Sequence, residues 1–230
     1  MEPIGDVNRR SGGAQNIPRP DAWRVGPPAP WSGRDLSVLS DHAVVRERLS
    51  AVVGPLNGVV AVGGESPRPS AVLVGFVESA AIPALLLTRR ADHLRNHRGE
   101  VSFPGGRLEA GETAVEAALR EAHEEVGLEP SRVHIRGTLP PLRTWVSDSL
   151  ITPVVAGITG AGGWTIDEGE VARVFEHPLT DFVREDTYAS EVWTTPRGES
   201  TLPFFHLDDE TIWGATARIV AGLIELLTLQ

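Results

Sequence analysis

The chain has 230 residues, of which 41% are hydrophobic and 23% are charged, which is ordinary for a globular protein with one domain and tails. It contains no cysteine, so disulfides and thiolate metal sites are excluded, and oxygen or imidazole ligands would favour Mg²⁺ or Mn²⁺. The formal net charge of -10 argues against a protein that coats nucleic acid or binds a membrane surface.

The sequence lacks the features that direct a chain into or across a membrane. No run approaches the roughly 18 consecutive apolar residues of a spanning helix. The first residues have no apolar core like that of a signal peptide, and residues 227–230 are not a peroxisomal Ser-Lys-Leu address. We therefore expect a cytoplasmic location.

Residues 1–35 are rich in Gly, Pro, Arg and Ser and follow no hydrophobic period. The proline-containing stretches 17–20 and 26–30 suit neither a helix nor the interior of a sheet. We predict a loosely ordered extension over 1–35, with Trp23 and Trp31 as its points of attachment, and one domain over 36–230.

The remaining elements follow from hydrophobic periodicity and turn residues. We predict helices at 36–53, 114–126 and 215–227. The predicted strands are 70–77, 84–88, a short one between 99 and 106, 133–139, 150–158, 171–175, 190–195 and 202–205. Mixed strands with few helices indicate an α+β fold rather than a regular alternation of strands and helices.

The helix at 114–126 has the best-defined ends. Thr113 is followed three residues later by Glu116, which is the spacing of a capping box. Gly127 stands where a left-handed C-terminal cap belongs. Ala118, Leu119, Ala122 and Val126 are expected to form the apolar stripe of this helix.

Glu121, Glu124 and Glu125 project together on this helix, because residues three or four apart share a face. Like charges at this density destabilise a helix by roughly a few tenths of a kcal/mol each, and a bound cation removes that penalty. The alternative is an ordinary solvated acidic face. The joint spacing with the glycine pair before the helix and Gly127 after it favours a metal site, and a metal that bridges phosphates.

A basic stretch precedes this helix. Between 89 and 107, five arginines against Asp92 and Glu100 leave a local charge of +3, which a polyphosphate substrate would need. The alternative is a basic loop that is simply solvated. The arginines are Arg89, Arg90, Arg95, Arg98 and Arg107.

Residues 106–128 resemble the Nudix box at every defining position. The resemblance implies an α/β/α sandwich around a mixed β-sheet, and Mg²⁺- or Mn²⁺-dependent hydrolysis of a nucleoside diphosphate linked to another moiety. It makes Glu121, Glu124 and Glu125 metal ligands together with the carbonyl of Gly105. It gives Arg120 and Glu112 supporting roles, in which they hold the helix and the preceding loop.

Residues 86–91 and 94–106 resemble the signature that precedes the box in coenzyme A pyrophosphatases, and residues 170–179 and 212–217 also resemble that subfamily. The likeness runs over 36–227 and implies a substrate with a diphosphate and a 3′-phosphate. A structural role for the loop histidine, His97, is an equal alternative to phosphate contact. The expected substrate-binding residues are Arg90, Arg95, His97, Arg98 and Arg107.

The hypothesis for the reaction is attack of a metal-activated water on one phosphorus, giving 3′,5′-ADP and 4′-phosphopantetheine from coenzyme A. The base is Glu121 itself or a loop carboxylate, Glu168 or Glu170, and we name Glu121, Glu124, Arg120 and Glu170 as catalytic. Alternatives are NADH or ADP-ribose as substrate, or a non-catalytic binding domain. We expect no nucleic-acid or membrane partner, and a homodimer is one possible assembly.

Overall fold

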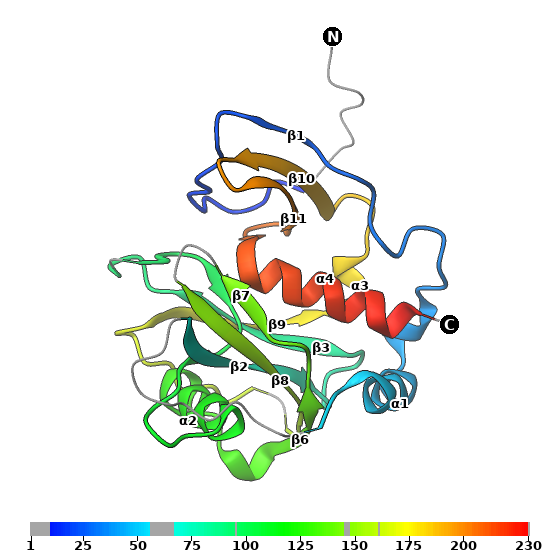
Figure 1. Cartoon of the computed structure of the whole chain (residues 1–230). Coiled ribbons are helices and arrows are strands. Elements are labelled where there is room, and N and C mark those ends of the chain that lie inside the picture. Colours follow the sequence, from blue (N-terminus) through cyan, green and yellow to red (C-terminus); the bar gives the residue numbers. More distant parts are fainter. Residues whose placement is uncertain (1–9, 56–66, 95, 145–147, 161, 230) are drawn as a thin grey trace. The chain divides into compact units, whose positions relative to one another are not determined.

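The computed structural model describes residues 10–55, 67–94, 96–144, 148–160 and 162–229. The chain divides into two compact units (Figure 1). One is Ser37–Leu179, and the other joins the chain up to Leu36 with Thr180–Gln230. Each unit has its own sheet, and the strands and helices together confirm the α+β prediction.

In the described part of Ser37–Leu179, eight strands form a mixed sheet in the order β4-β3-β2-β8-β6, with β5 on β2, β7 on β8 and β9 on β3. The pairing of β2 with β8 is parallel and the other pairings are antiparallel. The strands are β2 Arg68–Val77, β3 Ala84–Arg90, β4 Val101–Ser102, β5 Gly105–Arg107, β6 Val133–Thr138, β7 Leu142–Thr144, β8 Ser149–Ile158 and β9 Val171–Pro178. The helices are η1 Ser37–Ser40, α1 His42–Val52, α2 Ala114–Val126 and η2 Pro130–Arg132.

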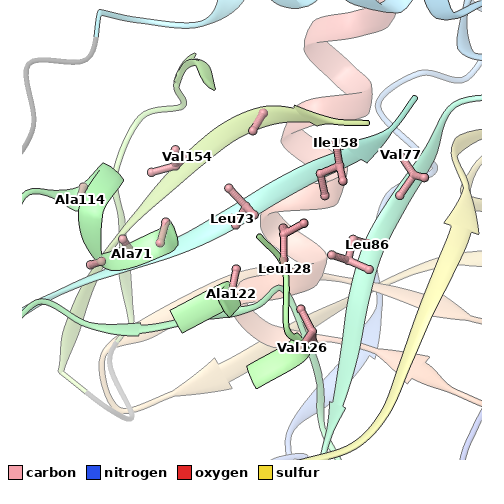
Figure 2. Close-up of a cluster of buried hydrophobic side chains, with 13 residues drawn as sticks. Ala71, Leu73, Val77, Leu86, Ala114, Ala122, Val126, Leu128, Val154 and Ile158 are labelled. Atoms are coloured by element: carbon pink, nitrogen blue, oxygen red, sulfur yellow. The ribbon is translucent and has the colours of Figure 1, made fainter. Parts of the chain in front are cut away.

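Helix α2 packs on this sheet through small side chains. Ala114, Ala117, Ala118 and Ala122 are fully buried in one cluster with sheet residues such as Leu73. Figure 2 shows Ala114, Ala122 and Leu73 within this cluster. The stripe differs from the predicted one, since Leu119 is only partly covered whereas Ala114 and Ala117 are buried. Alanine brings the helix backbone close to the strands, so the box carboxylates lie beside the sheet.

The predicted helix at 36–53 is divided. A 3-10 turn, Ser37–Ser40, comes first, and α1 begins only at His42. Asp41 accounts for the break, because its carboxylate accepts hydrogen bonds from the backbone N–H groups of Ala43 and Val44 and so caps α1.

The second unit has a four-stranded sheet among its described residues, in the order β1-β10-β11-β12. These strands are β1 Trp23–Val25, β10 Tyr188–Thr195, β11 Gly198–His206 and β12 Thr211–Ile212. The short helix α3 spans Leu179–Phe182, and α4 spans Gly214–Thr228 with Ile219, Val220, Leu223, Ile224 and Leu227 buried, as the periodicity predicted.

The described part of the N-terminal segment differs from the loosely ordered extension that we expected. Trp23–Val25 pairs with β10, and Arg19 forms an ion pair with the buried Glu191 at 2.8 Å. Trp31 is 2% exposed and packs on the rings of Tyr188 and Phe205, whereas Trp23 is 47% exposed. These contacts join residues far apart in the chain, so local composition could not reveal them. The assignment of 36–230 to one domain stays a prediction.

Among the described residues, no helix has both the length and the apolar character that crossing a membrane requires. The strands β1, β7 and β12 were not predicted, since each has only two or three residues.

Candidate active site

The ends of α2 are fixed by its own sequence. Thr113 Oγ1 accepts the N–H of Glu116 at 3.2 Å, while the Glu116 carboxylate accepts the N–H of Thr113 at 2.8 Å. At the other end Gly127 is left-handed, with φ 65°. The capping box and the glycine cap are therefore confirmed, and they fix where the glutamates of the last two turns lie.

The guanidinium of Arg120 donates hydrogen bonds to three carboxylates. Its Nε and Nη2 donate to Glu112 at 2.9 and 3.0 Å, and its Nη1 donates to Glu121 and Glu124, both at 3.0 Å. Nη2 also donates to the main-chain carbonyl of Arg107 at 3.1 Å. These bonds hold the loop before the helix against its last turns, which is the supporting role expected for Arg120 and Glu112.

The three box glutamates have different environments. Glu125 is 3% exposed, and burial raises its pKa from 4.5 to about 8, although the nearby Arg90 acts in the opposite direction. Burial also raises the pKa of Glu121, against the effect of Arg120. Glu124 is the outermost, with a side chain that is 57% exposed. The nearby arginines therefore do not fully offset the negative charges of Glu121 and Glu125.

The glycine pair before the box allows β5 to pass close to both the sheet and the helix. A Cβ on Gly106 would lie 2.2 Å from Oε1 of Glu121, and one on Gly105 would lie 2.3 Å from the carbonyl oxygen of Ala71. The N–H of Gly105 donates to Glu125 Oε2 at 3.3 Å. At Gly105 a side chain would meet the main chain of β2, whereas at Gly106 it would force the Glu121 side chain to move.

Arg90 and Glu170 reach this site from two other elements. Nη1 of Arg90 lies 3.6 Å from Glu125, and Nη2 lies 3.7 Å from Glu170. The pairing of β3 with β9 shifts register between Arg89 and Arg90, and such bulges re-aim side chains. Arg90 therefore links the buried glutamate of α2 to the loop carboxylate Glu170.

The other predicted binding residues are less closely connected with the box. Arg95 lies outside the described residues. His97 Nδ1 pairs with Glu100 Oε2 at 3.0 Å, an interaction that raises the pKa of His97 and agrees with the structural alternative for this residue. Arg98 and Arg107 are exposed. The binding roles of Arg98 and Arg107 and the ligand role of the Gly105 carbonyl stay predictions.

The loop between β8 and β9 was not predicted to touch α2. In its described parts, 159–160 and 162–170, the N–H groups of Thr165 and Asp167 donate to the carbonyls of Val126 and Glu125, both at 3.0 Å. No sequence signal connects the two segments, which lie about 40 positions apart. The loop brings Glu170 toward Arg90, and both Glu168 and Glu170 are exposed.

The donor set suits a hard divalent cation. The ligands on offer are carboxylates, and a cation would offset the charge of Glu121 and Glu125, whose burial disfavours ionisation. In the described residues, however, no three His, Asp or Glu side chains converge closely enough to enclose an ion. The glutamates pair instead with Arg90 and Arg120, so they match a cation in chemistry without forming a closed ligand shell.

Several solved structures are similar to this chain at low identity. A MutT/nudix family protein from Enterococcus faecalis is 16% identical with a TM-score of 0.46, over 71% of this chain and 62% of that one. The Nudix hydrolase RenU from M. smegmatis is 23% identical with a TM-score of 0.44, over 55% and 81% of the two chains.

Two other proteins are much more similar to this chain in sequence. "Uncharacterized Nudix hydrolase NudL" from Enterobacter sp. (strain 638) is 39% identical over 164 residues, which is 71% of this chain and 82% of that protein. The protein of the same name from Salmonella paratyphi B is 40% identical over 159 residues, or 68% and 81%. The model of the NUDIX domain matches residues 67–199, which include the whole box. The chain therefore belongs to the Nudix family, with the Nudix fold, and is a pyrophosphohydrolase of nucleoside diphosphate derivatives.

Proposed function

We propose that the protein hydrolyses the diphosphate bond of coenzyme A or its derivatives in a Mg²⁺- or Mn²⁺-dependent reaction. The observation that carries the proposal is the buried Glu125. The charge of Glu121 disfavours ionisation of this carboxyl, and the charge of Arg90 favours it. Arg90 belongs to the segment 86–106, whose sequence resembles the coenzyme A pyrophosphatase signature. The carboxylates of Glu121 and Glu125, whose charge a cation would offset, thus lie near Arg90, whose guanidinium is suited to binding a phosphate anion.

In this proposal Glu121, Glu124 and Glu125 hold the cation together with the Gly105 carbonyl. The cation, when bound, activates water and offsets phosphate charge. Arg120 keeps Glu121 and Glu124 oriented through its bonds of 3.0 Å to each.

In this proposal the substrate anion is bound by Arg90, Arg95, His97, Arg98 and Arg107. Arginine binds phosphate through two parallel hydrogen bonds, which suits a diphosphate and a 3′-phosphate. The charge of Arg89 is partly used in the structure, since its Nη2 donates to Asp92 at 2.8 Å.

The chemistry is a displacement at phosphorus. A bond forms between the water oxygen and one phosphorus, and the bond from that phosphorus to the bridging oxygen breaks, with the electron pair leaving on the other phosphate. A carboxylate, Glu170 or Glu121, takes the water proton. With coenzyme A the products are 3′,5′-ADP and 4′-phosphopantetheine, or its acylated form.

Two other functions would use the same Nudix box. The protein could prefer another dinucleotide such as NADH or ADP-ribose, because the box determines the reaction and not the substrate. A non-catalytic binding role is disfavoured by the presence of Glu112, Glu121, Glu124 and Glu125. A cytoplasmic location and a homodimer belong to the proposal as expectations from composition and family.

A substrate panel tests the proposal. Purified protein is incubated with Mg²⁺ or Mn²⁺ and coenzyme A, NADH or ADP-ribose, and the products are separated by chromatography. Coenzyme A should give the highest kcat/KM and should yield 3′,5′-ADP. Faster cleavage of another diphosphate would reject coenzyme A as the substrate, and no cleavage of any would favour a binding role.

A further inference from the structure

The loop between β8 and β9 completes the end of the metal helix. The last carbonyls of a helix have no partner within it and need one from elsewhere. In α2, the carbonyls of Glu125 and Val126 accept the N–H groups of Asp167 and Thr165, both at 3.0 Å. A Cβ on Gly127 would come within 3.0 Å of the Thr165 side chain, so loop and helix end are in close contact. The register of the loop is thereby tied to Glu125.

Trp164 is the anchor of this loop. Its indole Nε1 donates to Glu176 Oε1 on β9 at 3.1 Å, and the N–H of Gly162 donates to the same oxygen at 3.3 Å. The ring packs against the hydrophobic cluster between α2 and the sheet. The guanidinium of Arg132 lies 5.0 Å from the ring centroid, within the range of a cation–π contact.

The same Arg132 also holds the beginning of the loop. Its Nε donates to the carbonyl of Thr159 at 2.9 Å, and its Nη2 donates to that of Gly160 at 2.8 Å. Arg132 and Trp164 therefore form one unit that restrains the loop where it leaves the sheet.

The far end of the loop carries Glu170. Asp167 Oδ1 accepts the N–H of Gly169 at 2.8 Å, which makes a tight turn. The Glu170 carbonyl accepts the N–H of Ala91 at 2.8 Å, and its carboxylate lies 3.7 Å from Arg90. The side chain of Glu170 is half exposed, so its position depends on the loop backbone rather than on packing of its own.

We propose that Trp164 is a positioning residue for the reaction: through the loop 162–170 it sets where the carboxylate of Glu170 lies relative to the α2 carboxylates. The inference rests on the proposed function, because it requires Glu170 to act in the hydrolysis. Trp164 itself lies at the opposite end of the loop from Glu170, so it acts on the reaction only through the loop. Its loss should displace Glu170, and displacements near 1 Å can cost as much as about 100-fold in rate.

The test is a double-mutant cycle between Trp164→Leu and Glu170→Gln, measured as kcat on the best substrate of the panel. Leucine keeps an apolar side chain in the cluster but removes the Nε1 donor and the aromatic face. We expect Trp164→Leu to lower kcat at least ~10-fold in the wild-type background and less than ~2-fold in Glu170→Gln. Amide hydrogen exchange in 162–170 should also become faster.

A second pair of variants covers the case in which Trp164→Leu does not fold. Glu176→Ala removes the acceptor of both loop bonds, whereas the matched control Glu176→Gln keeps an acceptor oxygen. We expect Glu176→Ala to repeat the background-dependent loss and Glu176→Gln to stay near the wild-type rate.

Equal fold losses in the two backgrounds would overturn the positioning role, since a general structural defect would act whether or not Glu170 is present. An unchanged kcat in Trp164→Leu or in Glu170→Gln would also overturn it. Glu121→Gln separates this outcome from failure of the proposed function. If Glu121→Gln is inactive, only the positioning role fails; if it keeps the wild-type rate, the site itself is wrongly assigned.

Discussion

The burial of Glu125 makes a prediction about stability that is independent of activity. Glu125→Gln replaces the buried carboxyl by a neutral amide of nearly the same shape, which can still accept the N–H of Gly105. In the metal-free protein the variant should be more stable than the wild type at alkaline pH. A proposed metal ligand would thus be a source of instability when no cation is bound.

The magnitude follows from the pKa of Glu125, which burial raises from 4.5 to about 8. At 1.36 kcal/mol per pKa unit, the difference corresponds to roughly 5 kcal/mol, as an upper figure because water entry and relaxation reduce it. The folded state binds the proton more tightly than the unfolded state. This stabilisation is therefore fully present below pH 4.5 and is lost as the pH rises toward 8.

The assay is thermal unfolding in EDTA, followed by circular dichroism between pH 5 and pH 9 in steps of about one unit. At pH 5 the two proteins should differ by less than about 1 kcal/mol, and at pH 9 Glu125→Gln should melt higher by on the order of 10 °C. Glu124→Gln is the matched control, because that side chain is 57% exposed and its replacement should give no comparable gain in melting temperature at pH 9. Melting curves of Glu125→Gln that run parallel to those of the wild type at every pH would refute the reasoning.

Three further changes test other parts of the structure. Thr113→Ala removes the N-cap oxygen of α2 and should lower the free energy of unfolding by about 1 kcal/mol in chemical denaturation, whereas Thr113→Ser should not; equal losses would contradict the cap. Gly106→Ala places a Cβ 2.2 Å from the Glu121 carboxylate, so turnover should fall at least ~10-fold with an unchanged dichroism spectrum; a normal rate would contradict the close approach. Gly222→Ala lies within α4, where an added Cβ meets no atom within 4 Å, and should raise the free energy of unfolding by about 0.5–1 kcal/mol; a lowered denaturation midpoint would contradict this.

The parts of the site that depend on local sequence were predictable. The bounds of α2 match the predicted 114–126, because the capping pair Thr113 and Glu116 and the terminal Gly127 act within a few residues of the helix. Helical spacing predicts that Glu121, Glu124 and Glu125 share a metal site, and this stays a prediction because no three such side chains converge among the described residues. Most strands of the main sheet were also found, since continuous apolar runs such as β2 and β8 are buried on both faces.

The parts that depend on distant contacts were not predictable from one sequence. Arg90 lies near Glu125 and Glu170 at a point where the pairing of β3 with β9 shifts register. Trp164 reaches α2 through a loop for which no periodicity exists. In the other unit, β1 forms through three residues within a segment whose proline content argues against a strand. In each case the stabilising partner lies far away in the chain, so neither composition nor spacing contains the information.

The central claim is that the carboxylates of α2 hold the divalent cation that hydrolysis of the diphosphate requires. The most direct measurement is the initial rate of diphosphate cleavage at saturating Mn²⁺ for the wild type, Glu121→Gln and Glu125→Gln, with EDTA added to the wild type. We expect EDTA to abolish turnover and each variant to be at least ~100-fold slower than the wild type. Near-normal rates in both variants would contradict it.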